Sequence, residues 1–130
     1  MRRFREAVEA GDMTAVEALL AEDVVFTSPV VFRPYPGKAI TAAILRGVMR
    51  VFEDFHYVRE FAGADPRDHA LVFQATVNGR QVHGCDFLRL DDDGLIAELT
   101  VMVRPLSGAN ALAEAMGAQF ERIEREAVGG

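Results

Sequence analysis

Two tight-turn dipeptides, Asn78-Gly79 and Asp93-Gly94, constrain the fold of this chain more than any other feature of the sequence. Both positions of such a dipeptide tolerate the positive φ angles that a two-residue β-hairpin requires. Apolar and polar residues alternate on either side of both turns, which is typical of strands with one buried face. The second half of the chain therefore reads as an antiparallel meander, with strands predicted over residues 54–62, 71–77, 80–91 and 95–104.

The two turns also fix which residues of the meander lie opposite one another, since the pairing register follows from the loop length. The predicted pairs are Leu71–Asp86, Phe73–Gly84, Val101–Asp86, Leu99–Leu88 and Ala97–Leu90. Opposed residues share a face of the sheet. One face is then apolar with a single charged exception, and it comprises Leu71, Phe73, Ala75, Val82, Gly84, Asp86, Leu88, Leu90, Ala97, Leu99, Val101 and Val103.

The remaining apolar residues recur at steps of three and four, which is the spacing of amphipathic helices. Asp12 is placed to cap the second helix, and Glu22-Asp23 is expected to end it. A short strand is predicted from Val24 to Thr27, and Pro34-Tyr35-Pro36-Gly37 reads as a rigid loop. Helices segregated from an antiparallel sheet indicate an α+β fold in one domain, residues 1–130. The helical spacing runs from Phe4 to Val8 and from Met13 to Leu20, and two further helices are predicted from Lys38 to Phe52 and from Ala109 to Ala127.

Asp86 is the candidate functional residue, because it is the one charge on the apolar face. A carboxylate there loses hydration worth several kcal/mol unless it is paired or hydrogen-bonded. We expect a raised pKa and a neutral proton donor near pH 7, which suits proton transfer to or from a carbonyl compound. Gly84, two residues away, is expected to leave space for a ligand. The structural alternative is an Asp86 that is hydrogen-bonded to backbone or to Ser28.

The opposite face of the sheet is mixed rather than plainly polar. Arg89 and Glu98 are expected to form a cross-strand pair there. The other apolar and weakly polar residues of this face predict an interface between two copies of the chain, through His83, Cys85, Phe87 and Met102.

Composition excludes several classes of function. The 130 residues carry a formal net charge of −6, which argues against a nucleic-acid partner. No apolar stretch approaches the ~20 residues of a membrane span, so we expect no membrane partner and a cytoplasmic location. Cys85 is the only cysteine, so neither an internal disulfide nor a cysteine-built zinc site is expected, and no spacing indicates a metal or cofactor. Lys38 is the only lysine, which with the abundant alanine suggests a GC-rich bacterial genome.

The element order resembles the nuclear-transport-factor-2-like superfamily, which includes ketosteroid isomerase and the SnoaL-type polyketide cyclases. The resemblance lies in Ala10-Gly11-Asp12 between two helices, in the run from Ala21 to Pro29, in Pro36-Gly37 before a helix, and in the hairpin from Asp86 to Ile96. It covers nearly the whole chain and implies a curved sheet wrapped by helices into a cone with an internal cavity. A dimer through the outer sheet face is often part of this fold.

The resemblance carries over to the site only in part. Asp86 matches the position in ketosteroid isomerase whose protonated carboxyl helps to hold the developing oxyanion. That isomerase is the standard example of an Asp with a raised pKa. Ser28 stands where the isomerase has its general-base aspartate, and Phe4 stands where it has a tyrosine donor. Two of the three catalytic groups are therefore replaced, and steroid isomerisation by that mechanism is not expected.

Three functional hypotheses follow. The leading one is a protein that binds a hydrophobic small molecule in an apolar cavity with one acidic residue. The second is an isomerase, cyclase or hydratase that uses Asp86 as general acid or base, and the third is a dimeric interaction module without catalysis. Besides Asp86, the expected ligand-binding residues are Ser28, Phe32, Tyr35, Phe73, Gly84, Leu88, Leu99 and Val101.

Overall fold

The computed structural model describes residues 1–129 and contains four helices and six strands among them. The helices are α1 (Arg2–Glu9), α2 (Met13–Ala18), α3 (Lys38–Val51) and α4 (Leu106–Gly129). The strands are β1 (Leu20–Thr27), β2 (Tyr35–Pro36), β3 (Glu53–Ala62), β4 (Asp68–Val77), β5 (Arg80–Leu90) and β6 (Ile96–Arg104).

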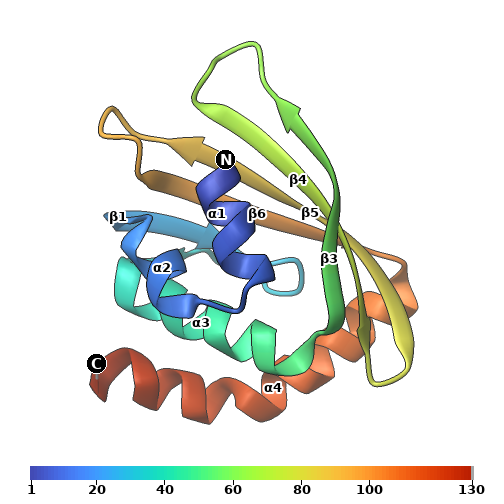
Figure 1. Cartoon of the computed structure of the whole chain (residues 1–130). Helices are drawn as coiled ribbons and strands as arrows, with labels where there is room; N and C mark the ends of the chain where they lie inside the picture. The colour runs from blue at the N-terminus through green and yellow to red at the C-terminus, as the bar shows by residue number, and fades with distance from the viewer. Residues whose placement is uncertain (130) are drawn as a thin grey trace.

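All six strands belong to one curved, unclosed sheet in the order β2-β1-β6-β5-β4-β3 (Figure 1). The meander β3 to β6 is antiparallel as predicted. β1 joins it in parallel to β6, so the sheet is mixed rather than wholly antiparallel. The α+β cone expected from the sequence is confirmed.

The predicted register holds across both hairpins with one local exception. Asp86 lies opposite Leu71 on β4 and Val101 on β6. The exception is Leu90, which pairs with Ile96 instead of Ala97. The loop after Asp91 has three residues rather than two, since the Asp91 amide donates to the Leu95 carbonyl at 2.8 Å. A register shift between Arg89 and Leu90 then restores the predicted pairing for the rest of the hairpin.

The first half of the chain departs from the prediction at the second helix. Asp12 caps α2 as expected, its carboxylate accepting from the amide of Ala15 at 3.1 Å. The helix nevertheless ends at Ala18, and Glu22-Asp23 lies within β1. The reason is tertiary: Leu20 pairs with Ile96 of β6, and both are fully buried. The expected rigid loop likewise contributes a short strand, because Tyr35 pairs with Phe26.

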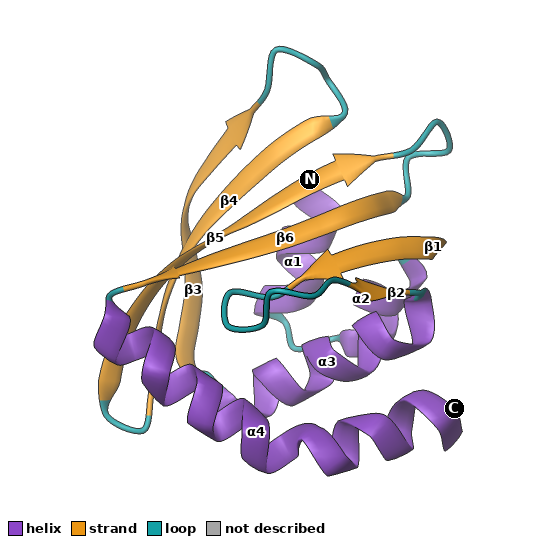
Figure 2. Ribbon diagram, turned by 180° about the vertical axis from the view of Figure 1, so that it is seen from behind, coloured by secondary structure: helices purple, strands orange, loops and turns teal. Residues whose placement is uncertain are grey.

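The helices cover the concave face of the sheet, so that the apolar face derived from the two turns becomes the wall of the core. Figure 2 shows α3 and α4 side by side across the open end of the curve, in line with their direct packing. α1 and α2 lie within the curve, in front of the sheet in Figure 1. None of the helices among residues 1–129 has the length and hydropathy that a membrane crossing requires.

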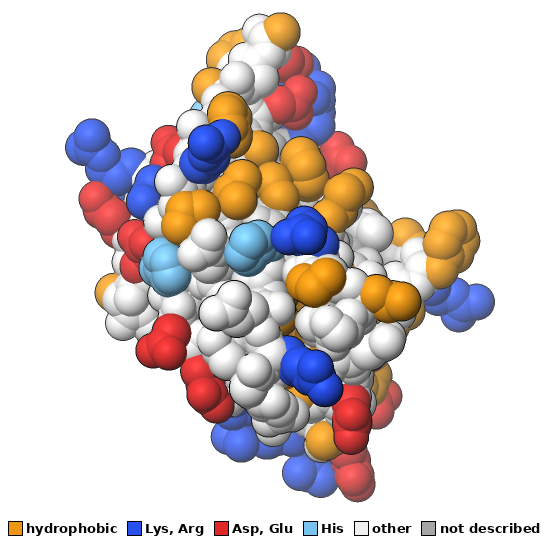
Figure 3. All heavy atoms as spheres, turned by 90° about the vertical axis from the view of Figure 1, so that its right-hand side faces the viewer, with side chains coloured by type: hydrophobic (Ala, Val, Ile, Leu, Met, Phe, Trp, Pro, Cys, Tyr) orange, Lys and Arg blue, Asp and Glu red, His pale blue; other side chains and the backbone are white. Residues whose placement is uncertain are grey.

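No helix among residues 1–129 covers the convex face of the sheet, and this face carries exposed apolar side chains. Met102 is 58% exposed and Phe87 42% exposed, and Val58 and Phe61 on β3 are exposed as well. In Figure 3 hydrophobic side chains gather beside histidines on the side where this face lies. The predicted Arg89–Glu98 pair is present on this face at 3.9 Å, although Arg89 makes a shorter contact of 2.7 Å with Asp68.

Candidate functional site

A pocket of about 380 Å³ lies between the concave face of the sheet and the helices. Its volume falls within the range of small-molecule sites, roughly 300–1,000 Å³. Every helix and strand contributes to its wall, and most of the contributed side chains are aliphatic, aromatic or methionine. The polar exceptions are Asp86, Tyr57, Tyr35 and Ser28, and no Lys, Arg or His is among the described residues that line it.

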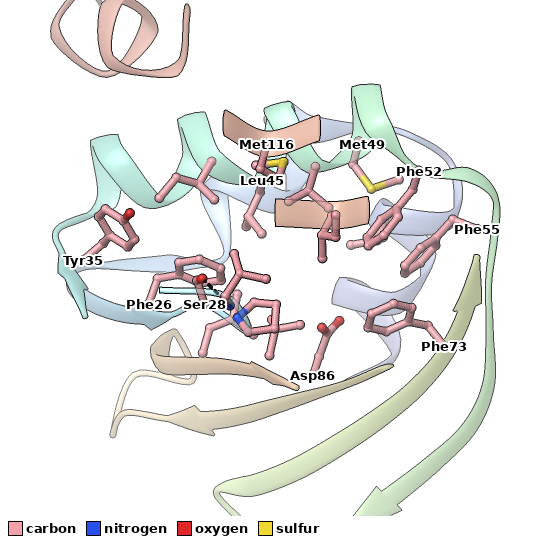
Figure 4. A pocket seen from close by; sticks show the side chains of 18 of the residues that line it. Phe26, Ser28, Tyr35, Leu45, Met49, Phe52, Phe55, Phe73, Asp86 and Met116 are labelled. Carbon is pink, nitrogen blue, oxygen red and sulfur yellow. Dashed lines mark hydrogen bonds between the residues drawn. The ribbon is translucent and has the colours of Figure 1, made fainter. Parts of the chain in front are cut away.

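Asp86 projects from the middle of β5 into this pocket (Figure 4). The residue is only 8% exposed to solvent. The hydroxyl of Tyr57, from β3, donates a hydrogen bond to Oδ2 of Asp86 at 2.7 Å. Both partners are buried, so this bond is shielded from competing water.

Burial raises the pKa of Asp86 to about 7, because the carboxylate loses its hydration in apolar surroundings; the hydrogen bond from Tyr57 opposes this rise. Burial is also the main reason that the pKa of Tyr57 lies well above its ordinary value, with the negative charge of Asp86 as the next cause. Tyr57 therefore remains a hydrogen-bond donor throughout the physiological range. Of this pair, Asp86 alone changes its protonation state near pH 7.

The second oxygen of Asp86 is available to a ligand. Oδ1 accepts no hydrogen bond from any residue in the described part of the chain, whereas every fully buried side-chain oxygen or nitrogen there has a partner. Oδ1 must therefore be reachable from the pocket. The carboxyl is thus held at one oxygen and free at the other, so that a group in the pocket can come within hydrogen-bond reach of Oδ1, as proton transfer requires.

Ser28 contributes a second polar group to the wall. Its Oγ accepts hydrogen bonds from the backbone amides of Val30 and Val31, each at 3.0 Å. Both bonds use the oxygen as acceptor, so the hydroxyl proton stays free to be donated. Ser28 is not bonded to Asp86, and the structural alternative in which it holds that carboxyl is wrong.

Aromatic rings flank the carboxyl on one side of the pocket. Phe55 packs against Phe73 with ring centroids 4.9 Å apart and against Phe52 at 5.5 Å. The ring of Tyr57 meets Phe55 edge to face at 5.0 Å, which fixes the plane of the phenol. Towards the other end of the pocket Tyr35 packs between Phe26 and Phe120. Figure 4 shows these two aromatic groups on opposite sides of Asp86.

Most of the residues predicted for the site do surround this pocket, although their role in binding stays a prediction. Ser28, Tyr35, Phe73, Asp86, Leu99 and Val101 line it. Gly84 and Leu88 share the concave face but do not reach the pocket. Leu88 is buried at 2% exposure within the core.

Two expectations about the pocket are wrong. The position of Gly84 leaves no room for a ligand, because the ring of its cross-strand neighbour Phe73 lies where a side chain would stand, and a Cβ atom there would collide with it. Phe32 is 100% exposed and does not line the pocket. The loop between β1 and β2 instead turns Val30 and Val31 towards the pocket, and the fold of this loop has no signature in the residue pattern.

Tyr57 is the hydrogen-bond partner of Asp86, and the sequence did not reveal it. The alternation in β3 places Tyr57 on the inward side, but no tight turn links β3 to β4. Two register shifts, one on each side of His56 and Tyr57, break the simple count along β3. A buried tyrosine hydroxyl ordinarily needs a hydrogen-bond partner, and Asp86 is the one carboxyl on the inward face of strands β4, β5 and β6.

Within residues 1–129, no group of three or more His, Cys, Asp or Glu side chains is arranged to hold a metal ion. The chemistry that the described site itself offers is proton transfer and hydrogen bonding in an apolar enclosure.

Comparison with known proteins gives both a family and a set of similar structures. A model of the SnoaL-like domain family matches residues 1–99. A crystal structure of a steroid delta-isomerase from Pseudomonas aeruginosa is 42% identical, covers 92% of this chain and 87% of its own, and superposes with a TM-score of 0.88. No curated protein matches the chain.

Two further crystal structures share the fold. An uncharacterized protein conserved in bacteria with a cystatin-like fold, from Silicibacter pomeroyi, is 34% identical over 96% of this chain and 92% of its own, with a TM-score of 0.85. An NTF2-like protein of unknown function from Cytophaga hutchinsonii is 21% identical over 79% of this chain and 85% of its own, with a TM-score of 0.62. The latter likeness concerns the fold alone.

Proposed function

The chain belongs to the SnoaL-like domain family, and we propose that it binds a hydrophobic, carbonyl-bearing small molecule in the inner pocket and moves a proton on that molecule through Asp86. The observation that carries this proposal is the state of Asp86. Its carboxyl is buried, bonded at Oδ2 by Tyr57, open to the pocket at Oδ1, and has a pKa of about 7. A general acid or base works best when its pKa lies near the working pH.

A single carboxyl suffices for an isomerase-type reaction. The carboxylate form of Asp86 takes a proton from a carbon beside the carbonyl group of the ligand, and the electron pair of that C–H bond passes towards the carbonyl oxygen. In a ligand with a carbon–carbon double bond next to the deprotonated carbon, Asp86 then returns the proton to the far carbon of that double bond, and the double bond moves into conjugation with the carbonyl group. Substrate and product are isomers, Asp86 ends as the carboxylate, and no cofactor is consumed. The free hydroxyl proton of Ser28 supplies a donor for a ligand oxygen.

The relative from Pseudomonas aeruginosa supports the choice of isomerase-type chemistry, because it is a steroid delta-isomerase and is 42% identical over nearly the whole chain. Ser28 and Phe4, which line the pocket here, stand at the positions where the isomerase resemblance implies a base and a tyrosine donor. The proposed mechanism therefore gives the base role to Asp86. Tyr57 holds that carboxyl from β3.

Deuterium exchange tests the proposal even while the product is unidentified. The protein is incubated in D₂O with a panel of apolar ring ketones (2-decalone, menthone and progesterone), and incorporation of deuterium beside the carbonyl is followed by mass spectrometry. We expect accelerated exchange for at least one ketone, with a rate that rises as the pH passes through about 7, since the carboxylate is the base. Asp86→Asn should lower the rate at least ~100-fold, the usual contribution of a general base.

The matched control is Asp68→Asn, which alters an aspartate on the neighbouring strand β4 that is paired with Arg89 outside the pocket. Its exchange rate should equal that of the wild type. Thermal shift with the same ketones reports binding separately. Binding without Asp86-dependent exchange would leave a binding protein and refute the catalytic role, and a panel in which no ketone raises the melting temperature would refute the ligand class.

A further inference from the structure

The peptide group of Tyr57 is held by a helix rather than by the sheet. β3 is an edge strand, so one side of its backbone has no neighbouring strand. On that side the Tyr57 amide donates to Oε2 of Glu9 at 3.2 Å, and the Tyr57 carbonyl accepts from Nη2 of Arg5 at 3.3 Å. Both side chains come from α1, which packs against β3. Edge backbone groups usually bond to water or remain open to another strand, so two side-chain partners on one residue are a specific arrangement.

The two side chains also bind each other and the tyrosine ring. Arg5 Nε lies 3.5 Å from Oε1 of Glu9, one helical turn further along α1. The Arg5 guanidinium lies 6.0 Å from the centroid of the Tyr57 ring, within reach of a cation–π contact. Nη1 of Arg5 also lies 3.7 Å from Oε1 of Glu60, on the same strand as Tyr57. Arg5 and Glu9 together therefore contact Tyr57 at its amide, its carbonyl and its ring.

Tyr57 needs such support because the strand is irregular at this position. Register shifts occur between Glu53 and His56 and again between Tyr57 and Arg59. A bulge loosens the regular ladder and alters the direction of the neighbouring side chains. The hydroxyl of Tyr57 stands at the far end of a long side chain, so a small rotation of its backbone displaces the donor from Asp86.

We propose that Arg5 and Glu9 are positioning residues of the site: they fix the backbone of Tyr57 so that its hydroxyl holds Oδ2 of Asp86 and leaves Oδ1 to the ligand. The role of Arg5 and Glu9 in catalysis rests on the proposed function. The structural content of this inference is independent of any substrate, so it is tested on the ligand-free protein.

Removing Glu9 has two effects on the pKa of Asp86, and they have opposite signs. The charged groups around Tyr57 and Asp86 show which effect acts in which direction. Arg5 and Glu9 from α1 and Glu60 from β3 are the charged groups at Tyr57, whereas the neighbours of Asp86 on β4 and β6 are Leu71 and Val101. Loss of the negative charge of Glu9 by itself lowers the pKa of Asp86. Loss of the hydrogen bond from a displaced Tyr57 raises it.

The experiment is a ¹³C NMR titration of the Asp86 carboxyl in the full chain. Tyr57→Phe should raise the pKa of Asp86 by roughly one pH unit, the usual weight of one buried hydrogen bond to a charged group. Glu9→Ala should raise it by a substantial part of that amount. Glu9→Gln should leave the pKa of Asp86 at or slightly below the wild-type value, because its amide oxygen still accepts from the Tyr57 amide and the loss of charge acts only to lower the pKa. In the double variant Glu9→Ala/Tyr57→Phe the pKa of Asp86 should not exceed that of Tyr57→Phe alone, because no hydroxyl is left to displace and only the loss of charge acts.

Glu6→Ala is the control, since Glu6 lies on the same helix and its side chain forms no hydrogen bond with Tyr57. Arg5→Lys provides a second variant that keeps the charge but loses the forked donor, and it should also raise the pKa. A pKa that falls or stays constant in Glu9→Ala, or that rises equally with and without the Tyr57 hydroxyl, would overturn the inference. Any of these results leaves the exchange experiment on the ketones unaffected, so the two proposals fail separately.

Discussion

At the scale of single residues, Asp86 shows how one carboxyl can be kept in an apolar pocket. Its neighbours across the strands, Leu71 and Val101, offer no charge, so within residues 1–129 the hydroxyl of Tyr57 is the only hydrogen-bond donor that replaces the hydration lost on burial. One neutral donor does not offset the desolvation of a charge, and the pKa rises to about 7. The residue that serves the proposed chemistry therefore destabilises the folded protein whenever it is ionised.

This cost predicts a pH dependence of stability. The pKa of Asp86 rises from an ordinary 3.8 to about 7 on folding, so the folded chain holds the proton more tightly than the unfolded chain between those values. The free energy of unfolding should therefore fall as the pH rises from about 4 to 7, and Asp86 should account for about 4 kcal/mol of that fall, at ~1.4 kcal/mol per pKa unit.

Asp86→Asn isolates this effect, because every other ionisable group is common to both proteins. Chemical denaturation at pH 5 and pH 8 should show the variant gaining stability relative to the wild type as the pH is raised, and exceeding it at pH 8. A difference between variant and wild type that does not change with pH would mean that the carboxyl titrates normally in the folded chain.

At the scale of secondary structure, the packing of α3 on α4 depends on one glycine. A Cβ atom at Gly47 would lie 2.6 Å from Cδ1 and 3.0 Å from Cγ1 of Ile123, which is fully buried. Glycine lowers helix stability by about 1 kcal/mol relative to alanine. Its presence in the middle of α3 is explained by the close approach of the two helices that cover the open end of the sheet.

We therefore predict that Gly47→Ala lowers the free energy of unfolding, by up to ~2 kcal/mol, because overpacking of 1–3 kcal/mol exceeds the gain in helix propensity. Ile123→Val, which removes Cδ1, should recover part of the loss when combined with it. Gly117→Ala on α4 is the control: nothing lies within 4 Å of its added methyl group, so it should stabilise the protein. Chemical denaturation of the two alanine variants and the double variant measures each value, and equal effects of the two alanine substitutions would contradict the packing argument.

At the scale of the whole molecule, the two faces of the sheet differ in what covers them. The concave face is covered by helices and encloses the pocket, whereas the convex face leaves Phe87 and Met102 exposed. We propose, as the sequence pattern suggested, that this convex face joins two copies of the chain through His83, Cys85, Phe87 and Met102. Contiguous apolar surface on a sheet that no helix covers is typical of such an interface. An interaction module without catalysis would use the same face.

Sedimentation equilibrium tests the dimer. The wild type should have twice the chain mass of 14.3 kDa, and Met102→Glu should have the mass of a monomer, because an introduced charge would be buried at the interface. Leu106→Glu is the control, since Leu106 is also exposed, at the start of α4, but lies outside this face; it should remain dimeric. A monomeric wild type would rule out both the dimer and the module.

Prediction from sequence succeeded where the physical cause was local. Asn78-Gly79 fixed the pairing of β4 with β5 along its whole predicted length, and with it the flanking of Asp86 by Leu71. At the second turn the predicted loop length was wrong, but the predicted pairing of β5 with β6 still holds beyond Leu90. The three-residue loop and the register shift next to Leu90 compensate each other. Prediction failed at the end of α2, where the hydrogen bonds of a parallel neighbour outweigh helical spacing.

The sequence alone thus determined the alternation of β4 and β5, the part of β6 from Glu98 onward that shares their faces, and the isolation of Asp86 among apolar neighbours on these strands, because these follow from a two-residue period and a tight turn. Only the tertiary structure decided that Tyr57 holds Asp86, that Phe73 fills the space beside Gly84, and that Phe32 points into solvent. These outcomes depend on bulges, ring packing and a loop between prolines. Such features arise from contacts between elements distant in the chain, and no periodicity within one element encodes them.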